Sequence, residues 1–266
     1  MKTALYTNAR DEINILEWVI HHLNLGFTYI YIYDHLSKIP IKSIVKNIKN
    51  VKVERIENEE IHKTDLMDKS FHYSSNKNID WILYLDADEF LILPNDDNVN
   101  FFLEKYNKYT QIGINWLNFG SNLHNKNPNG TILENYTKCD RHFHTNIKSF
   151  VRPNEVEHVI NPHCFKMKNM DLSVSTNFQV LNKETTWCFH NTDNINNVNA
   201  YIAHYIFQSY ETYLNRKKNR KRDDTGEKWD WGFDEHTLHN VFNDIDNFLP
   251  RDKYNNSNKE TMKKYL

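Results

Sequence analysis

The segment Asp80-Trp81-Ile82-Leu83-Tyr84-Leu85-Asp86-Ala87-Asp88-Glu89-Phe90 joins an apolar run directly to three carboxylates. Residues 81–85 are aromatic or aliphatic, which predicts a buried strand. Side chains alternate along a strand, so Asp86 and Asp88 should share one face if the chain stays extended, with Asp88 facing solvent in the free protein. Adjacent carboxylates repel each other, and Mg²⁺ or Mn²⁺ bound together with substrate phosphates relieves that repulsion. The alternative is a solvated acidic turn, which is the commoner setting of a D-x-D pattern.

The chain before this segment alternates between predicted strands and predicted helices. We expect strands over residues 3–7, 27–33, 51–55 and 81–85, with helices between them over 11–23, 41–48 and 61–78. Such alternation is typical of a mostly parallel sheet with helices on both faces, an α/β fold of the Rossmann-like type. Ligands of these sheets bind beyond the carboxyl ends of the strands, which is where Asp86 and Asp88 would lie. Neither a G-x-G-x-x-G pattern nor a P-loop follows the first strand.

The later part of the chain carries weaker patterns. We expect helices over residues 101–109, 132–139 and 195–222, and strands over 112–116 and 147–153, whereas residues 154–192 show no clear periodicity. The last forty or so residues, about 223–266, should form a helical extension with a charged, frayed tail. Because no linker composition interrupts the chain, we expect a single domain over residues 1–266.

The composition is ordinary for a soluble globular protein, with 39% hydrophobic and 26% charged residues among 266. A net charge of -2 argues against a general nucleic-acid binder. The 3 cysteines (Cys139, Cys164 and Cys188) are widely spaced, which favours a reducing compartment over a disulfide scaffold. No apolar stretch has the length of a signal peptide or a transmembrane segment. We expect a soluble cytoplasmic protein, or alternatively one peripheral to a membrane, or associated with a virion if the source is viral.

Three groups of residues occur in an order that resembles a known family. The first comprises Arg10-Asp11-Glu12, Glu17-Trp18, His22, Gly26 and Tyr31-Ile32-Tyr33-Asp34. The second comprises Trp81, Asp86, Asp88, Glu89 and Phe90, and the third comprises His204-Tyr205, Ser209, Glu211, Tyr213 and Arg216 on a predicted helix. A looser match is Lys148-Ser149, Val151 and Arg152-Pro153. Over roughly residues 3–220 the sequence resembles GT-A type glycosyltransferases, and within them the glycosyltransferase 2-like group related to family 92.

The resemblance implies a metal-dependent hexosyltransferase. Such an enzyme moves a sugar from a nucleotide-sugar donor, expected to be a UDP-sugar, to a glycan or other hydroxyl acceptor, with inversion. Asp86 and Asp88 would hold Mn²⁺ (or Mg²⁺) on the donor diphosphate, and His204 would supply a further ligand. The expected donor-binding residues are Asn8, Arg10, Glu12, Asp34, Lys148, Arg152 and Arg216. Glu12 and Glu17 could instead be structural acids.

The catalytic base is left open by the sequence. Inverting transfer needs a carboxylate within hydrogen-bond reach of the acceptor hydroxyl, and the candidates are Glu89, Glu155 and Asp234. Trp116 and Phe119 could stack on an acceptor sugar or equally pack in the core.

Two other functions compete with glycosyl transfer. A haloacid-dehalogenase-like phosphatase also places D-x-D after a buried strand, but its motif opens the domain and is not followed by a pair such as Glu89-Phe90. A non-catalytic nucleotide or sugar binder could keep the fold, although the intact Asp86 and Asp88 favour an enzyme. A homodimer is a further possibility that the sequence leaves open.

Overall fold

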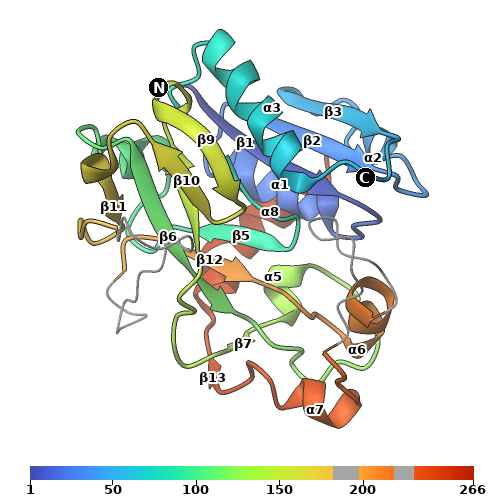
Figure 1. Ribbon diagram of the computed structural model, residues 1–266. Coiled ribbons are helices and arrows are strands. Elements are labelled where there is room, and N and C mark those ends of the chain that lie inside the picture. Colours follow the sequence, from blue (N-terminus) through green and yellow to red (C-terminus); the bar gives the residue numbers. More distant parts are fainter. Residues whose placement is uncertain (182–197, 219–230) are drawn as a thin grey trace.

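The structure is a computed structural model that describes residues 1–181, 198–218 and 231–266 (Figure 1). One sheet runs through it, and consecutive strand–helix units build its first half. The strands β1 (Thr3–Ala9), β2 (Tyr29–His35), β3 (Val51–Ile56) and β4 (Trp81–Tyr84) are all parallel, in the order β3-β2-β1-β4. The helices α1 (Ile15–Asn24), α2 (Ile41–Ile44) and α3 (Lys63–Asn76) connect them.

These helices cover opposite faces of the sheet. Apolar residues of α1 and α2 belong to one core cluster, whereas those of α3, such as Leu66 and Phe71, belong to another with Tyr6 of β1. The predicted α/β class, with a mostly parallel sheet covered by helices on both faces, is therefore confirmed. Gly26 ends α1 at a φ of 94°, and Phe27 N donates to His22 O across this turn at 3.2 Å, as expected of a helix-terminating glycine.

The second half of the sheet is assembled from distant segments. Next to β4 lie β8 (Ile147–Val151), which is antiparallel, then β6 (Gln111–Asn118), β12 (Tyr201–His204) and finally β5 (Glu89–Ile92). β12 runs parallel to β6 and antiparallel to β5, and β11 (Ser173–Ser175) also pairs with β6.

The helix predicted over residues 195–222 is wrong over residues 198–209, which contain a strand, whereas residues 210–218 are helical. All four residues of β12 are buried, and the strand therefore shows no alternation of apolar and polar residues. A short buried run of this kind has the same sequence pattern as a buried helical turn, so the pattern does not reveal the strand. Helical structure begins only with α6 (Tyr210–Tyr213), which leads into a π-helical turn over Leu214–Lys218. Residues 195–197 and 219–222 of the expected helix lie outside the described residues.

The remaining elements are short. Two small sheets pair β9 (Val156–Asn161) with β10 (Cys164–Met167) and β7 (Lys138–Cys139) with β13 (Ile245–Asp246). The short helices are α4 (Val99–Glu104), α5 (Ile132–Asn135), α7 (Glu235–His239), α8 (Asn256–Met262), 3-10 turns at Pro153–Glu155 and Met170–Leu172, and a π-helical turn at Arg251–Asn255. In the part of the chain that the structure describes, no helix is long and apolar enough to cross a bilayer.

The C-terminal segment differs from the frayed tail that we expected. Helix α8 packs against α1, where Asn24 Nδ2 donates to Asn258 Oδ1 at 3.0 Å. In the π-helical turn before α8, Tyr254 OH donates to Leu93 O just after β5 at 3.0 Å. The segment also contains β13, so the extension is not purely helical. Residues 223–230 of the expected extension lie outside the described residues.

Helix α1 closes the free edge of β5 with side-chain hydrogen bonds. Trp18 Nε1 donates to Glu89 O at 2.8 Å, and His21 Nε2 lies 2.8 Å from Leu91 O. Leu91 N donates to His22 Nε2 at 3.2 Å. An edge strand ordinarily presents unpaired backbone groups, and here three side chains of one helix bind them. The strand that follows the acidic turn is thereby attached to α1.

The same contacts fix both histidines as neutral imidazoles. His22 Nε2 accepts from Leu91 N, so its hydrogen must be on Nδ1, which lies 2.8 Å from Trp18 O. His21 Nε2 faces a carbonyl oxygen and therefore carries the hydrogen, while its Nδ1 faces the amide of Asn258 at 3.3 Å. Burial lowers the pKa of both imidazoles, that of His21 to about 4.

We expect the free energy of unfolding of His22→Gln to fall less steeply than that of the parent as the pH is lowered. The folded-state pKa of His22 is below its unfolded value, so this contribution to stability is present above about pH 6.5 and is lost as the pH falls. Each such histidine adds about 1.4 kcal/mol per pH unit to the slope, and glutamine does not titrate. Urea unfolding at about pH 7.5, 6 and 5 measures the free energy of unfolding of parent and variant.

Comparing how the free energy of unfolding changes with pH in the two proteins separates the effect of His22 from that of Glu17, which acts in the opposite direction. Burial raises the pKa of Glu17 to about 7, so Glu17 contributes stability below its unfolded pKa that is lost as the pH rises through about 7. Glu17 is present in both proteins and its effect cancels. Equal slopes in parent and variant would contradict the neutral assignment of His22.

Candidate active site

The acidic residues lie on a turn between β4 and β5. The strand ends at Tyr84, and Ala87 and Asp88 form the turn. Glu89 N donates to Asp86 O at 3.0 Å, and Asp86 N donates to Glu89 Oε2 at 2.8 Å. The extended geometry therefore does not continue through the motif, and the expectation that Asp86 and Asp88 share a strand face is wrong. The turn still lies beyond the carboxyl end of β4, where ligands of such sheets bind.

Asp86 is held by two lysines. Its Oδ1 contacts Nζ of Lys63, the first residue of α3, and its Oδ2 lies 3.2 Å from Nζ of Lys148 on β8. Lys148 Nζ also lies 3.6 Å from Glu89 Oε1. Burial by itself would raise the pKa of Asp86, but the two ammonium groups hold it well below its usual value. Asp86 keeps 34% of its side chain exposed, so this carboxylate is the open side of the cluster.

Asp88 faces a different set of groups. Its side chain is 2% exposed, which corrects the expectation that it faces solvent. Its Oδ2 lies 3.1 Å from Nη2 of Arg216, and the same nitrogen lies 2.7 Å from Oε1 of Glu12. Its Oδ1 lies 3.8 Å from Nε2 of His204. Because His204 Nδ1 lies 3.1 Å from Asn118 Oδ1, the hydrogen belongs on Nδ1 and the lone pair of Nε2 points towards Asp88.

Cationic side chains already balance the carboxylates of this cluster. Lys63 and Lys148 face Asp86, and Arg216 faces both Asp88 and Glu12. The repulsion from which the sequence argument inferred a metal is therefore relieved within the protein itself.

Asp88 and His204 have the chemistry of a divalent-metal site completed by a substrate. Among the residues that the structure describes, no group of three or more His, Cys, Asp and Glu is placed to hold a metal ion. Mg²⁺ and related ions commonly take only one or two protein ligands and complete their shell with phosphate oxygens and water. One carboxylate oxygen and one imidazole nitrogen face each other here, and Asn118 holds the ring through its other nitrogen, as hydrogen-bond partners of metal-bound histidines do. These residues fit a cation that is carried with a diphosphate.

Both carboxylate oxygens of Asp34 are bound within the fold. It is 1% exposed, its Oδ1 accepts from Arg55 Nη1 at 3.0 Å, and its Oδ2 accepts from Ile41 N at 3.0 Å. It therefore shapes the loop between β2 and α2. Asn8 is the buried penultimate residue of β1, and the partly exposed Arg10 directly follows this strand, at the same carboxyl edge of the sheet as the acidic turn.

Three predicted site residues are not brought to the acidic turn. The guanidinium of Arg152 stacks 4.4 Å from the ring of Trp81, which begins β4, so Arg152 lies at the opposite edge of the sheet. Glu155 ends the 3-10 turn that follows Arg152. Asp234 caps α7, where its Oδ1 accepts from Thr237 N at 2.7 Å. Glu89 lies in the cluster, but it is 0% exposed, burial raises its pKa above the usual value, and its Oε2 accepts from Asp86 N within the turn.

Sequence reasoning missed Lys63 altogether. It stands at the start of a helix with a weak apolar pattern, and no signal in the sequence distinguishes it from the other lysines. The ring of Trp116, for which acceptor stacking and core packing were both open, lies 4.5 Å from that of His204 and 5.6 Å from Lys148 Nζ. Phe119 packs against Tyr205 and is fully buried, so it is a core residue, the second of the two roles considered for it. Glu17 accepts from the backbone N of Ile132 at 2.6 Å and is likewise structural.

Comparison with known proteins gives a family match over nearly the whole chain. Residues 3–247 match the family model described as Glycosyltransferase family 92. No curated protein sequence matches the chain significantly. Among solved structures, S. aureus TarS (residues 1–349) is similar with a TM-score of 0.40 and 13% identity, over 57% of this chain and 47% of that chain. HddC from Yersinia pseudotuberculosis, complexed with GMP-PN, has a TM-score of 0.39 and 12% identity over 77% and 93%. The chain thus spans about half the length of the TarS structure.

Proposed function

The chain belongs to glycosyltransferase family 92, and we propose that it transfers a sugar from a UDP-sugar to a hydroxyl of a glycan or similar acceptor, with Mn²⁺ or Mg²⁺ bound. Membership makes the protein a glycosyltransferase and confirms the resemblance that its motifs indicate. It also removes the phosphatase alternative. The observation that carries the metal–diphosphate proposal is the pairing of Asp88 with His204 at the carboxyl edge of the sheet, beside Arg216.

Different residues of the cluster would bind different parts of the metal–donor complex. Asp88 and His204 would hold the cation, which when bound supplies positive charge against the departing diphosphate. Arg216 is positioned by Glu12 and Asp88, and its buried Nη1 has no hydrogen-bond partner among the described residues. A buried, unsatisfied guanidinium N–H is suited to a phosphate oxygen, because charge-assisted bonds of this kind are among the strongest in proteins. Asn118 keeps the imidazole of His204 turned towards Asp88.

We further propose that transfer inverts the anomeric carbon, as a single displacement by the acceptor hydroxyl does. We assign no catalytic base. Glu89 has no exposed surface and binds Asp86 N, and neither Glu155 nor Asp234 contacts the acidic turn in the described part of the chain. The anomeric configuration of the product, determined by NMR, tests inversion.

We expect excess EDTA to abolish donor hydrolysis and transfer, and added Mn²⁺ to restore both. The same preparation should show a rise in melting temperature with UDP only when Mn²⁺ is present, because a ligand of the native state stabilises it by mass action. GDP and CMP are the matched controls that test which nucleobase the protein recognises. Full turnover in EDTA would contradict the metal, and a shift with GDP or CMP but not UDP would contradict the donor. A shift without any hydrolysis of sugar nucleotides would indicate a non-catalytic binder.

A further inference from the structure

Strand β3 leaves one edge of the main sheet unpaired within the described residues. It pairs with β2 on one side only and lies at the outer edge of the sheet (Figure 1). Ile30 is opposite Val51, and Ile30 N donates to Asn50 O at 2.9 Å, so the residues flanking Val51 bond to β2. Backbone groups alternate in direction along a strand, and therefore Val51, Val53 and Arg55 present their N–H and C=O groups outwards.

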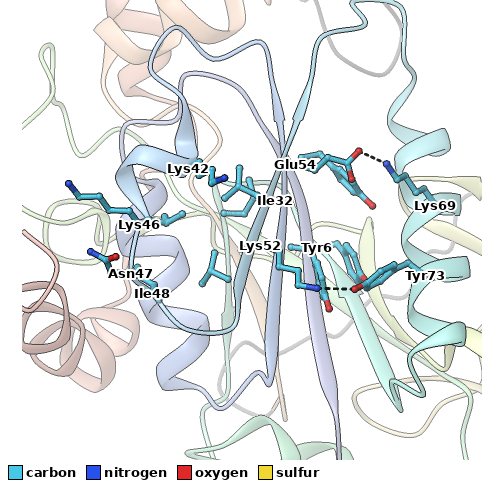
Figure 2. Close-up of a pocket in the computed structure, with 15 residues that line it drawn as sticks. Tyr6, Ile32, Lys42, Lys46, Asn47, Ile48, Lys52, Glu54, Lys69 and Tyr73 are labelled. Atoms are coloured by element: carbon cyan, nitrogen blue, oxygen red, sulfur yellow. Dashed lines mark hydrogen bonds and ion pairs between the residues drawn. The ribbon is translucent and has the colours of Figure 1, made fainter.

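A pocket follows this edge on both faces of the strand. Its volume is about 680 Å³, and it is lined by Lys46 and Ile48 near α2 on one side and by Lys69 and Tyr73 of α3 on the other. Figure 2 shows these two sets of side chains on opposite sides of β3, with Lys52 and Glu54 between them. The edge thus lies in a slot between the two helical layers, which is a place for one further strand.

The charges along this segment are self-complementary. Exposed Lys46, Lys49 and Lys52 precede Val53, and exposed Glu54, Glu57 and Glu60 follow it at the same spacings. If a second copy pairs antiparallel with a two-fold axis at Val53, Lys52 faces Glu54 of the second copy. Lys46 and Lys49 before the strand and Glu57 and Glu60 after it give its two ends opposite charges. A strand of another protein would need to reproduce this series, whereas a second copy supplies it.

We propose that the protein forms a homodimer through antiparallel pairing of β3 with β3 of a second copy. At the axis the two Val53 residues exchange N–H···O=C bonds, because both backbone groups of Val53 face outwards. Lys52 and Glu54 then form the closely spaced, non-hydrogen-bonded pair, in which side chains couple most strongly. The interface is isologous, so each charge pair occurs twice. Within one copy, Glu54 contacts Lys69 and Lys52 donates to Tyr73 OH, but these contacts are exposed and weak.

Sedimentation velocity of the full chain at about 1 to 100 µM and low salt tests the proposal. We expect a dimer that dissociates as salt is raised. Lys52→Glu and Glu54→Lys should each weaken dimerisation about tenfold, because each turns two attractive pairs into two repulsive ones. The double variant Lys52→Glu/Glu54→Lys restores opposite charges and should dimerise like the parent. Lys108→Glu, an exposed lysine after α4, is the charge-matched control.

Val53→Pro tests the backbone pairing separately from the charges. Proline removes the N–H at the axis from both copies, while the bonds from β3 to β2 come from the residues on either side. We expect a monomer with an unchanged far-UV spectrum and unchanged donor hydrolysis, since β3 does not contact the acidic turn. A parent that stays monomeric over the whole concentration range would overturn the proposal. A dimer that survives both Val53→Pro and the single charge reversals would do so as well.

Discussion

Replacing Asp88 with asparagine should lower donor hydrolysis at saturating Mn²⁺ at least about a hundredfold, the usual loss on removing one preorganised electrostatic stabiliser of developing charge. Asparagine keeps the shape of the side chain but removes the negative charge opposite His204 Nε2 and Arg216 Nη2. Binding of Mn²⁺ together with UDP, measured by calorimetry, should weaken in parallel. The variant should still fold, because Arg216 keeps its ion pair with Glu12.

The stability of Asp88→Asn should fall rather than rise. A solvent-facing carboxylate would have relieved repulsion when neutralised, but Asp88 is 2% exposed and faces a cation. We expect a loss of about 1 to 3 kcal/mol, the cost of an imperfectly satisfied buried polar group. Asp96→Asn is the matched control, since Asp96 is also buried and bound to a lysine but lies beyond the far end of β5. It should lose stability and keep its activity. If Asp88→Asn keeps most of its turnover, the acidic turn does not bind the donor.

Lys148→Met should be the most destabilising change in the cluster, by about 3 kcal/mol. The side chain of Lys148 is 1% exposed, and its ammonium faces Asp86 and Glu89. Burial alone would lower the pKa of Lys148, yet the two carboxyls raise it above its usual value, so the charged form is the one that the fold retains. Methionine fills the space but leaves Asp86 with Lys63 as its remaining cation. Because Asp86 keeps that partner, the cost stays below that of a fully broken pair.

Urea unfolding at about pH 7.5 measures this loss. Lys105→Met makes the same substitution in the Asp96 pair, where the lysine is 41% exposed, and should cost only about 1 kcal/mol because water replaces the ammonium. Donor hydrolysis should fall in Lys148→Met and remain in Lys105→Met. Equal unfolding midpoints for the two variants would show that Lys148 is no more than a surface partner of the cluster.

The first half of the sheet could be predicted because each of its elements is encoded locally. The strands at residues 3–7, 51–55 and 81–85 lie within one or two residues of β1, β3 and β4. The second half could not, because β12 and β5 are four-residue strands whose pairing joins His204 to Glu89 across more than a hundred residues of chain. Buried on both faces, neither strand carries the alternation that reveals a strand.

Part of the site could be predicted because its acidic residues directly follow a predicted strand in the sequence. Asp86, Asp88, Glu12, Arg216 and His204 do meet, although His204 ends a strand rather than standing on a helix. The cationic partners were the weaker part of the prediction. Lys63 was missed because nothing at the start of α3 distinguishes it from other lysines. Arg152 lies at the wrong edge because β8 runs antiparallel to β4 and carries the chain away from the acidic turn.

The bonds from α1 to the edge of β5 have a consequence for exchanging parts between enzymes. Trp18 and His22 belong to the opening motif of the chain, and Glu89 belongs to the acidic motif, yet Trp18 Nε1 and Glu89 O form one hydrogen bond. The two motifs are therefore halves of a single hydrogen-bonded module rather than independent signatures. A chimaera that receives the acidic turn of another transferase without its matching helix would inherit a strand with an unpaired edge. Grafts into this scaffold should carry residues 15–24 together with residues 81–92.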